Sequence, residues 1–455
     1  MNNAKSVIAV SLSLVAFASW AEWQYVAKGA EGSKHPDVSY ITDGNWELKI
    51  VSWADTFQTS GTWANSYLAG SGKLDLAAAQ ADLGKPLSPA GHYGSATQIT
   101  ELVLPDDFTT IQASFCPDCT SLVKISGGKP KTIGDDAFKG CTAIEVFDVD
   151  LSETTSIGDR AFNGITKVAF DFDLPALTSL GTRPFTMNQG VNPCQVRTFR
   201  APLLASIPSQ AFWNCTTLTS VAFADELTSI GNQAFYGCSA LASFSPALVP
   251  TTLSVSVVND SAFYGCTALA QPVVIADPTE GMVSFCVNAF NGAGFTKLDM
   301  SQSKCCFNLL RAFRNCNQME EVWFSPAQTN LLPWIDGSSF TIYGTGLKRF
   351  YFTGVAPDFT TVTAYLTSGC PDYQITSYAD PKMDEKWTAS EVPGFRALTD
   401  AEIAMLEGDD YPDAKAAYAA GKLLGTWQTR DAARMWFVKY QSPLRKPSGL
   451  MLILR

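Results

Sequence analysis

Cysteine is the side chain with the most chemistry to offer in this sequence of 455 residues, which holds 12 cysteines but only 2 histidines. Both histidines, His35 and His92, stand near the start, so a histidine-based metal site or a Ser-His-Asp triad in the main body is excluded. Cys116 and Cys119 form a CxxC motif, but neither a second CxxC nor the βαβ surroundings of a thioredoxin-like site accompanies it. We therefore expect no metal ion, no cofactor and no redox catalysis.

The cysteines divide into two sets by their place in a repeated motif. One set occupies a single repeat position that faces a core, where a thiol serves as a small apolar group: Cys141, Cys215, Cys238, Cys266 and Cys316, with Cys119 close to the same position. We expect a ladder of buried free thiols there, although neighbouring rungs lie near the Cα separation of a disulfide. The better disulfide candidates stand outside this register: Cys116, Cys194, Cys286, Cys305, Cys306 and Cys370.

The acidic side chains carry no recognisable catalytic pattern. The chain has 43 Asp and Glu against 32 Lys and Arg, a net charge of −11 and a pI of about 4.8, which argues against nucleic-acid binding. Carboxylate pairs suited to glycoside hydrolysis always occur among so many acids, yet none sits in a distinctive motif, and no Walker A or GxSxG motif is present. We predict that the protein is not an enzyme.

A repeated phenylalanine sets the architecture. It recurs every 23 to 28 residues, usually after an alanine and three residues before a cysteine: Phe115, Phe138, Phe162, Phe185, Phe212, Phe235, Phe263, Phe290, Phe313 and Phe340. The segment after each cysteine alternates as a strand does, as in residues 218–223. One unit cannot bury its apolar side alone, whereas stacked units share a continuous core. We predict an α/β repeat solenoid of about ten coils, with one short strand per coil and a helical or irregular return.

The units KTIGDDAFKGCTAIEVF and LTSIGNQAFYGCSALASF resemble the BspA-type leucine-rich repeats of secreted and surface bacterial proteins. The resemblance covers about residues 99–376 and implies a curved right-handed solenoid, a role in adhesion and protein binding, and no shared catalytic residues. Three places depart from the pattern and leave the local coil geometry open: residues 182–185 lack the alanine, residues 116–119 insert one residue, and residues 303–307 are not repeat-like.

The first 21 residues have the pattern of a secretory signal peptide. Lys5 precedes an apolar run over 7–17, and Ser19 and Ala21 offer small residues for cleavage after about Ala21. A retained N-terminal anchor is the alternative. No later run reaches the ~20 apolar residues of a membrane span, so we expect an exported chain, extracellular or at the cell surface, with no transmembrane span after cleavage.

Two flanking segments lack the repeat. We predict an N-terminal capping module over 22–98, because a solenoid end exposes apolar surface; its tryptophans leave a glycan-binding site open as an alternative: Trp23, Trp46, Trp53 and Trp63. Residues 377–455 are predicted to form an α+β module with strands near 435–440 and 450–454. From Lys422 the tail has seven basic residues and one acidic residue, so it either folds against the acidic solenoid or serves as a sorting or surface-attachment signal.

The candidate binding residues are the outward positions of the later strands, where charges frame two aromatic rings: Lys297, Asp299, Glu320, Glu321, Trp323, Lys348, Arg349 and Tyr351. Aromatic residues are enriched in binding hot spots, although these two could instead pack against an inserted loop or the C-terminal module. Earlier coils offer mostly small outward residues. We therefore predict a non-enzymatic exported repeat protein that binds a protein or a surface glycan through its strand face, in adhesion or surface interaction. The alternative is a carbohydrate-binding or polysaccharide-utilisation accessory protein that uses the N-terminal tryptophans.

Overall fold

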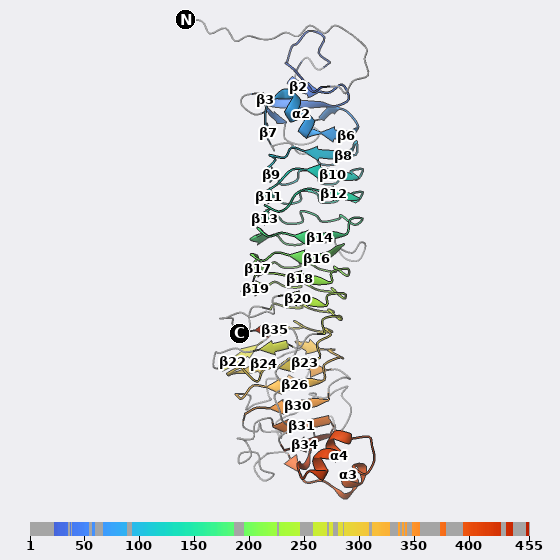
Figure 1. Cartoon of the computed structure of the whole chain (residues 1–455), viewed down its shortest axis with the longest axis vertical. Helices are drawn as coiled ribbons and strands as arrows, with labels where there is room; N and C mark the ends of the chain where they lie inside the picture. Colours follow the sequence, from blue (N-terminus) through green and yellow to red (C-terminus); the bar gives the residue numbers. More distant parts are fainter. Residues whose placement is uncertain are drawn as a thin grey trace.

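The computed structural model shows a long rod of stacked coils with a small module at each end (Figure 1). Successive strands lie one above the other along the rod. The chain therefore runs from one end of the rod to the other, and only its last strand, at 452–454, returns to the middle. The structure describes residues 22–34, 37, 39–53, 57–59, 67–88, 93–185, 195–224, 227–245, 258–270, 273–275, 281–284, 286–308, 312–327, 335–336, 339–340, 342–343, 348–354, 374–378, 395–428, 434–439 and 452–454.

One side of the rod, the strand face, carries one strand per coil, as the alternating pattern predicts. These strands are parallel and form three ladders. Along the chain they are β6 (Gly72–Asp75), β8 (Ile99–Leu104), β10 (Lys124–Gly127) and β12 (Val146–Asp148); β14 (Phe170–Asp173), β16 (Val196–Arg200), β18 (Ser220–Ala222) and β20 (Ser243–Ser245); and β21 (Val273–Ile275), β23 (Lys297–Asp299), β26 (Glu321–Phe324), β30 (Arg349–Phe352) and β31 (Gln374–Tyr378).

The return side of the coils carries a second set of short strands, and no helix lies in the described residues between 93 and 354. The predicted repeat solenoid with one short strand per coil is thus confirmed, and of the two expected kinds of return the irregular one is present, so the coils form a β-solenoid. The return strands are β9 (Thr110–Ile111), β11 (Thr132–Ile133), β13 (Ser156–Ile157) and β15 (Ser179–Leu180); β17 (Ser206–Ile207) and β19 (Ser229–Ile230); β22 (Gly281–Ser284) and β24 (Cys305–Asn308); β25 (Phe313–Arg314) and β29 (Ile342–Tyr343); and the antiparallel pair β27 (Ile335–Asp336) and β28 (Ser339–Phe340).

A helix fails to form on the return because two residues per coil adopt left-handed backbone angles. In the coil of Phe235, for example, Gln233 has φ +56° and Gly237 has φ +73°. Alternate amides of this turn bond to the next coil instead of to the fourth residue before, as when Phe235 N–H donates to Ala262 O over 2.8 Å, whereas the amides of Ala234 and Tyr236 bond three residues back within the coil. A glycine also lets the coils approach: a Cβ on Gly231 would lie 2.4 Å from the amide nitrogen of Ser209 in the preceding coil.

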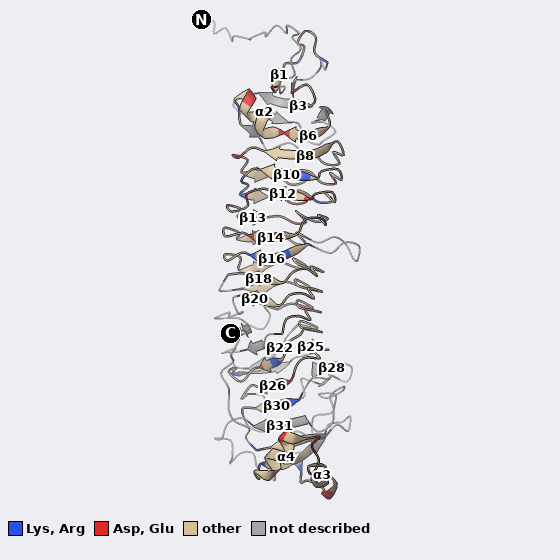
Figure 2. Cartoon of the chain, turned by 45° about the vertical axis from the view of Figure 1, so that its right-hand side comes forward, with Lys and Arg blue, Asp and Glu red and all other residues tan. Residues whose placement is uncertain are grey.

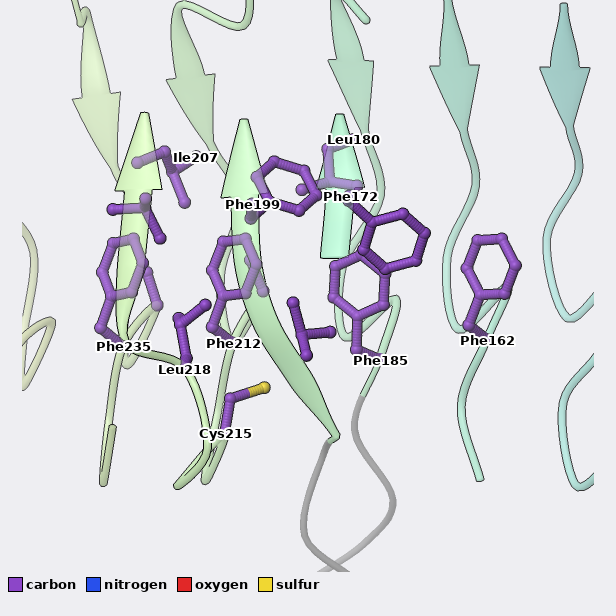
Figure 3. Packing of buried hydrophobic residues seen from close by; sticks show 14 of the residues in the cluster. Phe162, Phe172, Leu180, Phe185, Phe199, Ile207, Phe212, Cys215, Leu218 and Phe235 are labelled. Atoms are coloured by element: carbon purple, nitrogen blue, oxygen red, sulfur yellow. The ribbon is translucent and has the colours of Figure 1, made fainter. Parts of the chain in front are cut away.

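The repeated phenylalanines form a buried column through the rod (Figure 3). Phe235 is fully buried and stacks on Phe212 and Phe263, with ring centroids 5.1 and 5.2 Å apart and interplanar angles of 6° and 10°. The stacking continues to Phe290 and Phe313 at 5.5 and 4.9 Å. The expected spine is therefore present over the described coils; the side chain of Phe340 lies outside the described part.

The N-terminal module places a sheet above the first coil, antiparallel except that β7 pairs with β4 in parallel: β1 (Gln24–Val26), β2 (Ser39–Thr42), β3 (Glu47–Trp53), β4 (Phe57–Thr59), β5 (Tyr67–Ala69) and β7 (Leu87–Ser88). Its helix α2 (Leu76–Leu83) begins after Asp75, whose carboxylate accepts the Ala78 amide over 2.8 Å, and ends at Gly84 with left-handed angles. Because β6 pairs with β8 in parallel, this module is continuous with the strand face.

The C-terminal module extends the last ladder. It consists of β32 (Phe395–Arg396), α3 (Asp400–Met405), α4 (Pro412–Ala419), β33 (Leu423–Gln428), β34 (Arg434–Val438) and β35 (Leu452–Leu454). β34 adds to β31 in parallel, and β33 and β32 follow in antiparallel order, whereas β35 lies at the opposite end of the same nine-stranded sheet, against β21. Among the described residues, no helix is both long and apolar enough to cross a membrane.

Replacing Phe235 by alanine should destabilise the rod by about 3–5 kcal/mol, because it removes a fully buried ring from a stack that closes on both sides. Chemical denaturation followed by circular dichroism measures the change. Leu203→Ala is the matched control, since its side chain is 56% exposed. Equal effects of the two substitutions would contradict a column of stacked rings as the core.

Acid should weaken the C-terminal module before the rod. Glu402 completes a capping box with Thr399, and Arg396 donates two hydrogen bonds to its carboxylate over 2.6 and 2.8 Å. Although burial opposes ionisation, these hydrogen bonds lower the pKa of Glu402 to about 2. A lowered pKa stabilises the fold above the ordinary value of 4.5, and this contribution is lost as the pH falls from there towards 2. Hydrogen exchange of the α3 amides measured between pH 5 and pH 2.5 should rise earlier than that of β16; Glu402→Gln should remove the difference.

Candidate functional site

The structure brings the predicted binding residues together on three neighbouring strands, β23, β26 and β30. The register pairs Lys297 with Glu321 and Glu321 with Arg349, and it pairs Asp299 with Trp323 and Trp323 with Tyr351. Parallel pairing in register therefore produces two columns on the outward side of these strands. Glu320 and Lys348 come just before β26 and β30 and extend the charged column.

Trp323 and Tyr351 form a stacked pair with ring centroids 4.0 Å apart and an interplanar angle of 21°. The Lys297 ammonium lies 4.4 Å from the centroid of the Trp323 ring, and Trp323 Nε1 donates to Glu321 Oε2 over 3.1 Å. The exposed fractions of the two aromatic residues are only 5% and 7%. Burial raises the pKa of Tyr351 to about 12. The rings are thus covered, as the packing interpretation expects, and only the charged side chains around them reach solvent.

Each charge at this site has an opposite partner. Lys348 pairs with Glu320 over 2.6 Å, Lys297 pairs with Asp299 over 2.9 Å, and Arg349 reaches Glu321 over 3.3 Å. Arg349 also pairs with Asp413 of α4, which ties the coil of β30 to the C-terminal module. The exposed members are Glu320 and Lys348, whose side chains are 49% and 55% accessible.

The first half of the strand face carries exposed features that the sequence pattern failed to reveal. Val123 and Val146 are 38% and 44% exposed, and the Val146 amide donates to Val123 O over 3.1 Å, so the two stand on neighbouring coils. An exposed ion pair, Glu145 with Lys167, lies beside them at 2.8 Å. We call Val123 and Val146 the valine patch. Val146 pairs in register with Lys124, and Lys124 with Glu101, so Val146 faces outward as these two residues do and does not take the buried position of Ile125. The sequence pattern missed the patch because it expects an apolar residue to face the core.

Charged residues also cross between coils further along the face. Asp171 pairs with Arg197, and Asp173 pairs with Arg200 over 2.7 Å, and all four residues are exposed. Figure 2 colours the acidic and basic residues along the coils. The expectation of mostly small outward residues in the early coils therefore holds only near β18 and β20 and is wrong for β10 to β16. The alternation placed these side chains outward, but their identity differs from coil to coil.

Comparison with known proteins settles the family. The model of the BspA-type leucine-rich repeat region matches residues 91–192, 191–318 and 248–371, in 6 copies. The chain belongs to the BspA-type leucine-rich repeat family. No curated protein matches it. The BspA-type coils account for the spacing of the phenylalanines, and every strand from β8 to β30 lies within the matched range.

Several solved bacterial leucine-rich repeat proteins are similar to this BspA-type chain. One from T. pallidum is 22% identical with a TM-score of 0.31, covering 37% of this chain and 78% of that one. One from Bacteroides ovatus is 14% identical with a TM-score of 0.41, covering 76% and 97%. A leucine-rich cell surface protein from Faecalibacterium prausnitzii is 16% identical with a TM-score of 0.24, covering 69% and 95%.

The cysteine of the BspA-type unit acts as a buried hydrogen-bond donor. Cys238, Cys266 and Cys316 donate through Sγ to the carbonyl of the phenylalanine one coil before, over 3.0 to 3.2 Å. Burial raises the pKa of Cys316 to about 12, so this thiol is not a nucleophile at neutral pH. In the described part of the chain, no group of three His, Cys, Asp or Glu side chains is arranged to hold a metal ion.

The disulfide expectations are partly wrong. Cys215, expected as a free rung of the ladder, is disulfide-bonded, whereas Cys116 and Cys286, expected as bridge candidates, are free. Cys116 is fully buried in the core. The remaining candidates have side chains outside the described residues: Cys194, Cys305, Cys306 and Cys370.

Two of the N-terminal tryptophans belong to the core of their module. Trp46 is fully buried and donates through Nε1 to Lys73 O over 2.6 Å, and Trp23 is 4% exposed. A ring must present a free face to stack on a sugar, so neither serves a glycan site. The side chains of Trp53 and Trp63 lie outside the described residues.

Replacing Trp323 by alanine should lower the free energy of unfolding by about 3–5 kcal/mol, since the ring is buried against Tyr351 and Lys297. Glu320→Ala, which breaks only an exposed ion pair with Lys348, should cost no more than about 1 kcal/mol. Denaturant titration of both variants gives the comparison. A Trp323→Ala variant as stable as the parent chain would show that the ring is a surface feature after all.

Proposed function

We propose that this chain is a non-enzymatic exported repeat protein that binds a protein or a surface glycan through the outward strand face of its solenoid, in adhesion or surface interaction. The observation that carries the proposal is that face itself. Parallel strands repeat in register along it, and their inward residues pack into the core with the phenylalanine column. From β10 to β16, where the outward residues stand in solvent, these residues are free to differ from coil to coil at little cost to the fold, which is what a recognition surface requires.

The valine patch is the part of the face best suited to begin a contact. Val123 and Val146 are among the few large apolar side chains that the described surface exposes, and covering them removes apolar area from water. The charges next to them, such as Glu145 and Lys167, give a polar rim to an apolar centre.

The group around Trp323 contributes to the proposed surface in a different way. Its rings are buried, so the partner would meet the charges that they hold in place, chiefly Glu320 and Lys348. These residues alternate in sign and are paired within the chain, so the surface suits a partner with its own mixed charges and polar groups. Lys297, Asp299, Glu321 and Arg349 then position the exposed pair.

The dimensions of the face favour a large partner over a small ligand. Ten coils at a strand spacing of ~4.8 Å give a surface roughly 50 Å long. A strip of this length needs a width of only ~16 Å to reach the ~800 Å² that each partner contributes to an ordinary protein–protein interface. Members of the BspA-type family are typically surface-associated, and the N-terminal segment with cleavage after about Ala21 is consistent with export.

The decisive measurement uses the purified chain 22–455 to capture partners from intact cell surfaces and a glycan array, followed by titration of the captured partner. Val146→Glu, which puts a charge on the valine patch, should weaken binding at least tenfold without lowering the melting temperature. Leu203→Glu is the matched control: it changes an exposed apolar side chain that lies outside the strands of the face and should leave binding unchanged. Equal affinity of both variants would refute the strand face as the binding surface.

A further inference from the structure

The strand face is interrupted twice within the described coils, first between β12 and β14 and again between β20 and β21. At the second interruption one ladder ends at β20 and the next begins at β21, and no pairing joins these two strands in the described residues. On the return side the same two coils are continuous: Ile230 bridges Val258, and Phe235 stacks on Phe263 at 5.2 Å. The interruption therefore concerns the strand face alone, while the spine passes it unbroken.

The last strand of the chain sits at this interruption. β35 pairs with β21 in parallel, with Leu452 opposite Val273, Ile453 opposite Val274 and Leu454 opposite Ile275. Figure 1 shows the C-terminus beside β20 and β22, in the middle of the rod and far from the helices of the C-terminal module. The predicted strand at 450–454 thus pairs with a coil that precedes it by almost 180 residues, and not with its neighbour in sequence, β34.

The connection to β35 is long enough to let it leave without disturbing the rest. From β34 the sheet order passes β31, β30, β26, β23 and β21 before it reaches β35. Six strand spacings of ~4.8 Å amount to roughly 29 Å. The 13 residues between Val438 and Leu452 reach at most roughly 45 Å. The reach of the connecting residues thus exceeds the separation of the two strands. β34 keeps its own partners, β31 and β33, whether or not β35 is docked.

Departure of β35 would leave two complementary edges in every copy of the chain. One is the edge of β21, and the other is a short run of leucine and isoleucine with unpaired backbone groups. The edge of β21 already pairs with this sequence in one defined register. The last strand of a second copy has the same sequence, so it can form the same backbone hydrogen bonds. Charge assists the encounter, because the basic tail that begins at Lys422 belongs to a chain whose net charge is −11.

We propose that β35 is an exchangeable strand and that the edge of β21 accepts the last strand of a second copy of this chain in the same parallel register. Two copies that exchange strands reciprocally form a closed dimer, and one-way exchange forms an open series. Within one chain the tether gives β35 a high effective concentration, so the closed monomer dominates in dilute solution. The exchanged form becomes more populated where the local concentration of chains is high, as on a surface. The proposal is independent of the partner that the strand face binds.

Cysteine pairing between two single variants tests the exchange. Val274 and Ile453 are register partners in a parallel ladder, so their Cα separation of ~4.8 Å lies within the range of a disulfide. Full-length Val274→Cys and Ile453→Cys proteins are mixed at high concentration and oxidised. Non-reducing gels and peptide mass mapping should show a dimer that is joined through the two introduced cysteines. Mapping separates this bond from those of the native cysteines, and each variant oxidised alone gives the background.

The double variant Val274→Cys, Ile453→Cys is the control for docking within one chain. It should form its disulfide as a monomer in dilute solution. If it does so while the mixed single variants give no joined dimer at high concentration, exchange between copies is refuted. Absence of the bond in the double variant would equally overturn the proposal, because β35 would then not lie on β21. Chains that end at Met451 and at Leu454 complete the test: only the second, which keeps β35, should form dimers at high concentration, and these should return to monomers on dilution.

Discussion

The hydrogen bonds that join the repeated phenylalanine to the next coil are the interaction on which the rest of the rod depends. The amides of Phe138, Phe212 and Phe235 each donate to the carbonyl of the alanine that precedes the next phenylalanine, over 2.7 to 2.8 Å. The alanine is small enough for the next ring to lie directly on the last one, and a cysteine thiol from the next coil caps the phenylalanine carbonyl where the motif is complete. One residue therefore fixes both the spacing of the backbone and the packing of the core, since a buried amide left unpaired would be costly.

This constraint explains why the departures from the repeat do so little damage. At residues 182–185 a proline replaces the alanine, but the acceptor is a carbonyl, which proline also has, so Phe162 still donates to Pro184 O over 2.7 Å. The rings of Phe162 and Phe185 remain stacked at 16°. The insertion at 116–119 has a larger effect. There the amide of Cys116, and not that of Phe115, reaches Ala137 O, and the rings of Phe115 and Phe138 meet edge to face at 82°.

The sequence predicted the longer repeated features and missed the short return strands and the contacts between distant segments. The spine, the strand of each coil and the columns that unite Lys297, Glu321 and Arg349 follow from spacing and alternation, which are local properties. The return strands were not predicted because most of them are only two residues long, which is too short to show an alternation of apolar and polar residues. The covering of Trp323 and Tyr351 was one of two interpretations that the sequence left open, because a contact such as that of Arg349 with Asp413, across 64 positions of sequence, leaves no local pattern. The docking of β35 on β21 is likewise a contact between distant segments, for which an apolar run gives a strand but no partner.

The two halves of the strand face thereby come to differ in kind. From β10 to β16 the outward side chains stand in solvent, and Glu145, Asp171 and Asp173 each pair with a basic residue of the neighbouring coil. From β23 to β30 they support buried rings and a link to α4. Because each coil contacts only its neighbours, a solenoid is weakest at its ends, and a connection from α4 to the coil of β30 holds the last coils against that loss. The first half needs no such support, since β6 and the N-terminal sheet already continue its ladder. Its outward positions are consequently the ones that the fold leaves available for contact with other molecules.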